Sequence, residues 1–175
     1  MSPHPPSRYA TKAVLSALAL FCLCSLSSNS VLAADAPAGS VKSVAGEALV
    51  TRAGAAAPLK IGDRVYERDV LTTGKGATLG LVLRDNSTLS LGPGSRLVVE
   101  RFLFEPEKGA LAQVLKLSRG SMAAVSGEIV KLNPEVAKIE TPVYSVGIRG
   151  THVLLNVEPG LETAEDKAQV TGAAK

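Results

Sequence analysis

Residues 78–91 read Thr-Leu-Gly-Leu-Val-Leu-Arg-Asp-Asn-Ser-Thr-Leu-Ser-Leu, and this stretch decides the fold class. Between Leu79 and Leu83 every second residue is leucine, so one face of an extended strand is made of leucine alone. Three residues suited to turns, Asp85-Asn86-Ser87, interrupt the strand. Leu89 and Leu91 then resume the alternation. Short apolar strands separated by turn residues indicate an all-β protein.

The same pattern extends in both directions and predicts one β domain over residues 41–158. Structural turns are predicted at Gly62 and Asp63 and at Gly74, where glycine or aspartate follows an apolar segment. The leucine pairs recur every eight to ten residues, which favours short stacked strands in a β-solenoid or roll. A meander in a β-sandwich has similar spacing and remains the alternative. Residues 110–117 fit a strand or a helix, and the pattern does not decide between them.

The two ends of the chain have a different composition from the middle. Residues 1–33 read as a signal peptide: Arg8 and Lys12 precede an apolar segment that ends in a small-residue cleavage site before Ala34. Residues 34–40 are expected to form a mobile lead-in, and residues 159–175 a polar, flexible tail. The protein is therefore expected to be periplasmic or exported. Both cysteines, Cys22 and Cys24, would leave with the signal peptide, so no disulfide is expected.

The remaining composition gives little sign of catalysis or of a cofactor. Outside the predicted signal peptide, basic and acidic side chains nearly balance, which argues against a nucleic-acid partner. The segment Thr72-Thr-Gly-Lys-Gly76 lacks the upstream glycine and the hydroxyl of a phosphate loop. His152 has no cysteine or second histidine with which to bind zinc. Asp63, Asp69 and Asp85 are predicted to accept backbone hydrogen bonds in turns. We predict no enzyme activity, no cofactor and no metal site.

The segments Thr141-Pro142 and Val146-Gly-Ile-Arg-Gly-Thr151, together with the preceding turns, resemble the FecR-type periplasmic domain. The resemblance covers residues 39–157 and implies a β domain that binds other components of the cell envelope. FecR-type sensor regulators also have a segment that grips a sigma factor, a membrane span and a further signalling domain. We expect this chain to lack these parts, so the resemblance does not carry the sigma-factor role to it.

Arg149-Gly150-Thr151 is the most specific part of this resemblance. Gly150 is expected at a structural turn with a positive φ or a close backbone contact. Arg149 is expected to bind a carboxylate or backbone carbonyls and to clamp neighbouring strands. The other interpretation makes Arg149 and Thr151 a partner-binding site.

Two classes of function remain open on the sequence alone. The first is a non-catalytic binding or regulatory protein that contacts an envelope or membrane sensor protein. The second is a module that binds peptidoglycan or another polysaccharide. Sugar-binding surfaces usually present aromatic rings, and only Tyr66 and Tyr144 are available for this among the tyrosines of the predicted domain. The sequence makes no prediction of oligomeric state.

Overall fold

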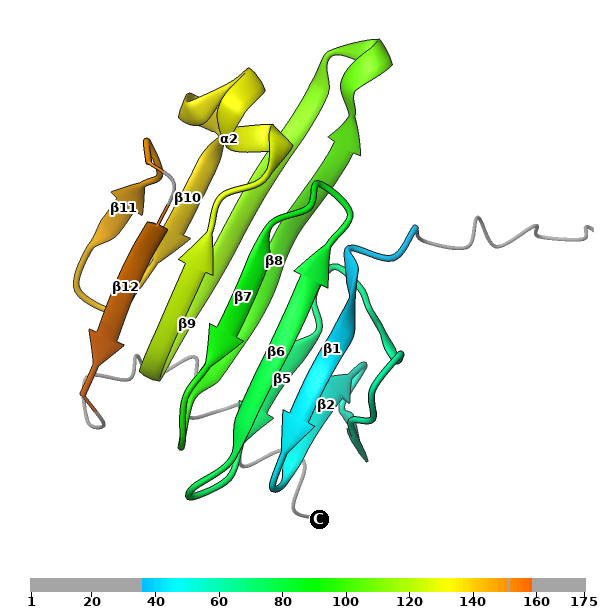
Figure 1. Ribbon diagram of the computed structural model, residues 1–175, viewed down its shortest axis with the longest axis vertical. Coiled ribbons are helices and arrows are strands. Elements are labelled where there is room, and N and C mark those ends of the chain that lie inside the picture. Colours follow the sequence, from blue (N-terminus) through cyan, green and yellow to red (C-terminus); the bar gives the residue numbers. More distant parts are fainter. Residues whose placement is uncertain (1–35, 151, 159–175) are drawn as a thin grey trace, which may run out of the picture. The chain divides into compact units, whose positions relative to one another are not determined.

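The computed structural model describes residues 36–150 and 152–158. The predicted signal peptide, Thr151 and the predicted tail lie outside the described residues. The described part is all-β, as predicted: one twelve-stranded sheet curls into a half-barrel, so that two layers of strands face each other (Figure 1). Its strand pairs are antiparallel except for one parallel pair.

Each layer is assembled from strands that are distant in the sequence. One layer contains β1 (Gly39–Ala45), β4 (Arg64–Val65), β6 (Thr78–Leu83), β7 (Thr88–Leu91) and β12 (His152–Val157). The other contains β2 (Ala48–Arg52), β3 (Ala55–Pro58), β5 (Val70–Thr73), β8 (Arg96–Glu105), β10 (Ala137–Glu140) and β11 (Ser145–Gly147). The remaining strand, β9 (Ala110–Val125), belongs to both layers. Short helical turns are η2 (Pro106–Lys108), α2 (Glu128–Leu132) and η3 (Pro134–Val136).

The long strand β9 joins the two layers by turning a corner at Gly120. Its first half pairs with β8 and, in parallel, with β10, while its second half pairs with β7 and β12. Gly120 has a φ of +85°, and a Cβ at this position would lie 2.5 Å from the Cα of Ser95. Only glycine fits both the backbone conformation and the space. The segment 110–117, which the pattern left open, is therefore a strand.

The alternating leucines face the core as predicted, but they do not form stacked rungs. Leu79 pairs with Leu91 and Leu81 with Leu89 across the antiparallel β6–β7 hairpin, and all four are at most 1% exposed. Hairpin strands and rungs give the same sequence spacing, which is why the solenoid prediction failed. The two facing layers belong to one curled sheet, whereas the sandwich alternative has two separate sheets. Both layers contribute to one aliphatic core, to which Phe102 adds a buried ring.

Candidate functional site

The turn between β6 and β7 is closed by the side chain of Asp85, as the sequence predicted. Asp85 is fully buried, and its Oδ1 accepts a hydrogen bond from the Ser87 N–H at 3.1 Å. Its Oδ2 accepts a second bond from the Ser87 hydroxyl at 2.7 Å. Asn86 lies at the tip with a φ of +64°, a conformation that asparagine tolerates better than most residues.

This turn also holds the start of α2, which lies about forty residues further along the chain. The Ser87 Oγ accepts a hydrogen bond from the Gly127 N–H at 2.9 Å, and the Asp85 carbonyl accepts one from the Glu128 N–H at 2.7 Å. A Cβ on Gly127 would lie 2.1 Å from that carbonyl oxygen, so the close approach requires glycine. Asn86 Nδ2 adds a bond to Glu128 Oε1 at 3.2 Å. The turn therefore positions α2 against the sheet.

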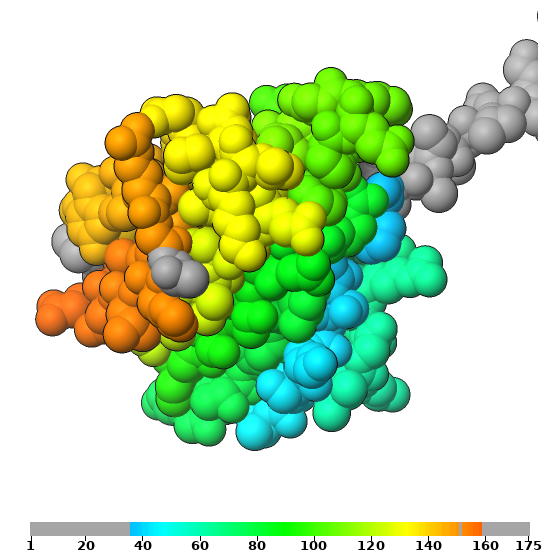
Figure 2. All heavy atoms as spheres, turned by 45° about the horizontal axis from the view of Figure 1, so that its top comes forward, coloured from blue at the N-terminus to red at the C-terminus, as the bar shows by residue number. Residues whose placement is uncertain are grey.

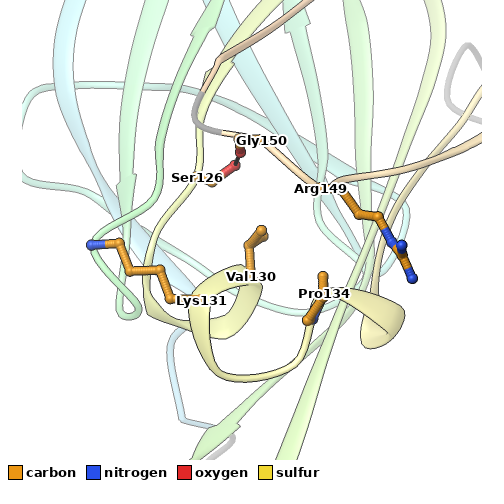
Figure 3. A pocket seen from close by; sticks show the side chains of 6 residues that line it. All are labelled: Ser126, Val130, Lys131, Pro134, Arg149 and Gly150. Atoms are coloured by element: carbon orange, nitrogen blue, oxygen red, sulfur yellow. Dashed lines mark hydrogen bonds between the residues drawn. The ribbon is translucent and has the colours of Figure 1, made fainter.

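A hollow of about 580 Å³ lies beside α2, and we call it the α2 hollow. In Figure 2 the yellow α2–η3 segment and the orange segment that leads into β12 lie next to each other on this face. The lining residues are Ser126, Val130, Lys131, Pro134, Arg149 and Gly150. Val130 points toward Gly150, whereas the side chains of Lys131 and Arg149 diverge to opposite sides (Figure 3). The hollow thus combines an apolar centre with two cationic side chains at its rim.

Arg149 pairs with Glu135 at this rim, and both side chains are largely exposed, at 75% and 70%. The predicted carboxylate partner exists, but it belongs to η3 on the surface, so the pair does not clamp buried strands. The expectation for Gly150 is wrong. Its φ is not in the left-handed region, and apart from its chain neighbours no atom of the described residues lies within 4 Å of a Cβ placed there. Its carbonyl accepts a hydrogen bond from the Ser126 hydroxyl, which links this segment to the end of β9.

The two remaining predicted turns, at Gly62–Asp63 and at Gly74, do not line the α2 hollow. Gly62 has a φ of +89°, and the neighbouring Asp63 accepts the Lys60 N–H on Oδ2 at 2.7 Å. Gly74 donates its N–H to the Glu47 carbonyl at 2.8 Å. These contacts fix the ends of strands, and we see no part for them in the hollow.

The buried Asp69 carboxylate forms a second cluster with Arg52, a half-exposed arginine that was not predicted as its partner. The Arg52 guanidinium donates to both carboxylate oxygens, each at 2.7 Å, and the Tyr66 N–H donates to Oδ2 at 2.8 Å. The hydrogen bond to Asp69 raises the pKa of Arg52 above its ordinary value. The Arg52 guanidinium also lies 4.4 Å from the centre of the Tyr66 ring. This bidentate pair ties β2 to the turn before β5.

Within residues 36–150 and 152–158, no group of three or more His, Cys, Asp or Glu side chains could hold a metal ion. No helix in the same part of the chain is long and apolar enough to cross a membrane. His152 is exposed on β12.

Arg149 and Gly150 were predicted from the sequence as site candidates, but the residues on the other side of the hollow were not. Val130, Lys131 and Pro134 come from a segment to which no structure had been assigned. A local signal was present: Gly127 precedes Glu128-Ile-Val-Lys-Leu132, and Asn133-Pro134 follows it, a combination that is typical of a short helix and its end.

The family model described as FecR protein matches residues 69–171, which is more than half of the chain. The chain belongs to the FecR family. FecR proteins are a non-catalytic family of regulators of sigma factors. The matched region of this FecR protein includes the Asp85 turn, α2, Arg149 and β12, so the α2 hollow lies wholly within it. No curated protein and no solved structure matches the chain.

Proposed function

We propose that this FecR protein is a non-catalytic regulator of the cell envelope that acts in the periplasm through protein–protein contact. Membership of a regulatory family supports the first part of the proposal. The observation that carries the second part is the α2 hollow, because it brings the family-typical Arg149 next to an exposed helix.

The chemistry of the hollow favours a particular kind of partner segment. Val130 is only 8% exposed and lies at the floor of the hollow, and Pro134 is half-buried beside it. Leu132 of α2 is 59% exposed and offers most of the accessible apolar surface. Lys131 and Arg149 stand at the rim. Such a site fits an apolar side chain in the centre and a carboxylate on either side, where it would meet a cation.

A polysaccharide ligand is less well supported. One face of the Tyr66 ring is covered by the Arg52 guanidinium at 4.4 Å, so this ring does not offer that face to a sugar. Tyr144 is 46% exposed and lies in the loop between β10 and β11. A stacking platform usually needs more than one exposed ring, so protein contact remains the proposal.

The experiment places a photocrosslinking amino acid at Leu132, beside the hollow, in the periplasmic protein. The matched control is Ile61, another exposed apolar residue, which is 69% exposed in the loop before β4. We expect one partner to be captured from position 132 and not from position 61. Equal capture from both positions, or none from position 132, would refute the proposed surface.

A second variant separates binding from stability. Arg149→Ala and Lys108→Ala each remove one partner of an exposed ion pair, with Glu135 and Glu105 respectively. Exposed pairs contribute about 0–1 kcal/mol, so both variants should melt near the wild-type temperature. We expect only Arg149→Ala to reduce capture from position 132. Retention of full capture by Arg149→Ala would remove this residue from the site.

A further inference from the structure

The strand β12 ends one layer of the sheet, and within residues 36–150 and 152–158 no strand pairs with its outer edge. Among the described strands it pairs only with β9. Its sequence, His-Val-Leu-Leu-Asn-Val, contains no charged residue and no proline. An open strand edge exposes unpaired N–H and C=O groups, and proteins usually protect such edges with charges, proline, bulges or short length.

The other outer strands of the described sheet carry such protection. β4 has two residues and β11 has three, so each offers little edge for pairing. β3 has four residues and ends at Pro58, which cannot donate a backbone hydrogen bond. β12 has six residues and none of these features. Of the four strands at which the described sheet ends, β12 is therefore best suited to receive another strand.

The side chains of β12 alternate between the core and the outer face of the sheet. Val153, Leu155 and Val157 pack against the core. His152, Leu154 and Asn156 are exposed, and Leu154 is the most exposed large apolar side chain of the described residues, at 82%. A single exposed leucine is common on a protein surface, but Leu154 lies in the middle of an unprotected strand edge.

We propose that β12 pairs antiparallel with β12 of a second copy of this chain, with the two-fold axis at Leu154. Each Leu154 then lies opposite the other Leu154, and each His152 lies opposite Asn156 of the other copy. Opposed residues share a face of an antiparallel pair, so the exposed leucines cover each other and the polar residues meet polar residues. A shift by one residue would instead set Leu154 against the inward-facing Leu155.

The charges beside the strand favour the same self-pairing. Within β12 there is no charge to repel its own copy. Glu158 directly follows the strand, and Arg149 precedes the strand by three residues. Antiparallel pairing therefore brings the acidic end of each β12 toward the basic start of the other copy's β12. The two-fold axis produces this contact twice. This complementarity selects a second copy over an unrelated strand.

Sedimentation equilibrium tests the proposal on the full chain. A six-residue edge forms a small interface, so we expect a weak dimer with a dissociation constant of about 1–100 μM. Leu154→Lys places two lysines opposite each other and should weaken the dimer at least about tenfold. Ser90→Lys is the matched control, because Ser90 is exposed on the central strand β7 and has no free edge. A monomer at all concentrations, or equal effects of the two variants, would overturn the proposal.

Cysteine crosslinking tests the register in a chain with Cys22→Ser and Cys24→Ser. Under copper–phenanthroline oxidation, Leu154→Cys should form a covalent dimer, because each cysteine faces its own copy. His152→Cys alone should not, whereas His152→Cys combined with Asn156→Cys should. Crosslinking by every single variant would overturn the register. The β12 amides that bond to β9 are protected in any case, so only the amides that point to the outer edge are informative. Slow exchange of those outward amides in a purely monomeric protein would show that other residues of the chain cover the edge, and would also overturn the proposal.

Discussion

Replacing Ser87 with alanine removes one hydroxyl that two distant parts of the chain share. Ser87 is 1% exposed. Its Oγ–H donates to Asp85 Oδ2 at 2.7 Å, and the same oxygen accepts the Gly127 N–H at 2.9 Å. The variant therefore leaves one carboxylate oxygen and one buried backbone N–H without these partners. The second of these groups lies at the residue before α2.

The expected loss follows from the two groups. Each buried polar group left without a partner costs about 1–3 kcal/mol, so with two such groups Ser87→Ala should lower the free energy of unfolding by about 2–6 kcal/mol. For a domain of this size, each kcal/mol corresponds to about 3–6 °C in melting temperature. We therefore expect the melting temperature to fall by at least about 6 °C. Because the lost contact holds the start of α2, the amides of Gly127 and Glu128 should also exchange faster with solvent.

Thermal melts followed by circular dichroism, together with hydrogen exchange, measure both effects. Ser90→Ala is the control, since it is the same chemical change on an exposed residue of the next strand, β7. It should change stability by less than about 0.5 kcal/mol. Equal melting temperatures for Ser87→Ala and Ser90→Ala would refute the reasoning, because they would show that the shared hydroxyl does not hold α2 in place.

Three further predictions concern the core, the corner of β9 and export. Leu81 is fully buried, so Leu81→Ala should lower the free energy of unfolding by about 2–5 kcal/mol in a denaturant titration, whereas the exposed Lys75→Ala should change it little. Gly120 and Gly54 both have a positive φ, but only a Cβ at Gly120 would meet other atoms. Gly54→Ala should therefore cost about 1–3 kcal/mol and Gly120→Ala distinctly more, and equal melting temperatures would contradict the crowded corner. Intact-mass spectrometry of the periplasmic fraction should find a chain that begins at Ala34; a lipid-modified or uncleaved chain would contradict the predicted signal peptide.

The individual strands were the part of the fold that the sequence predicted best. Thr78–Leu83 and Thr88–Leu91 are strands β6 and β7, and their leucines are buried. Alternation is a local property, because each strand buries one face wherever it lies in the sheet. The arrangement of the strands is not local. The spacing between leucine pairs is compatible with rungs and with a hairpin, and only the register of Leu79 with Leu91 distinguishes them.

The candidate site was predicted only in part, for a similar reason. Arg149 was expected to reach a carboxylate, and it does so at Glu135, but no pattern indicated which carboxylate or how exposed the pair would be. The helix α2 is held by hydrogen bonds to the Asp85–Ser87 turn, across forty residues between Gly127 and Ser87. Sequence periodicity describes neighbours along the chain and does not contain such contacts. The corner at Gly120 was not predicted either, because alternation does not distinguish one strand that turns a corner from two separate strands.

The shared strand β9 has a consequence for the order in which this protein folds. Its partners lie on both sides of it in the sequence: β7 and β8 precede it, and β10 and β12 follow it. During synthesis from the N-terminus, β7 and β8 are complete before β9 (residues 110–125), the strand with which both of them pair. Pairings between distant segments form slowly, since the loop entropy must be overcome first. Neither layer can therefore complete its strand pairing before β9 has been synthesised. The native sheet as a whole forms only after residues 110–125 are available.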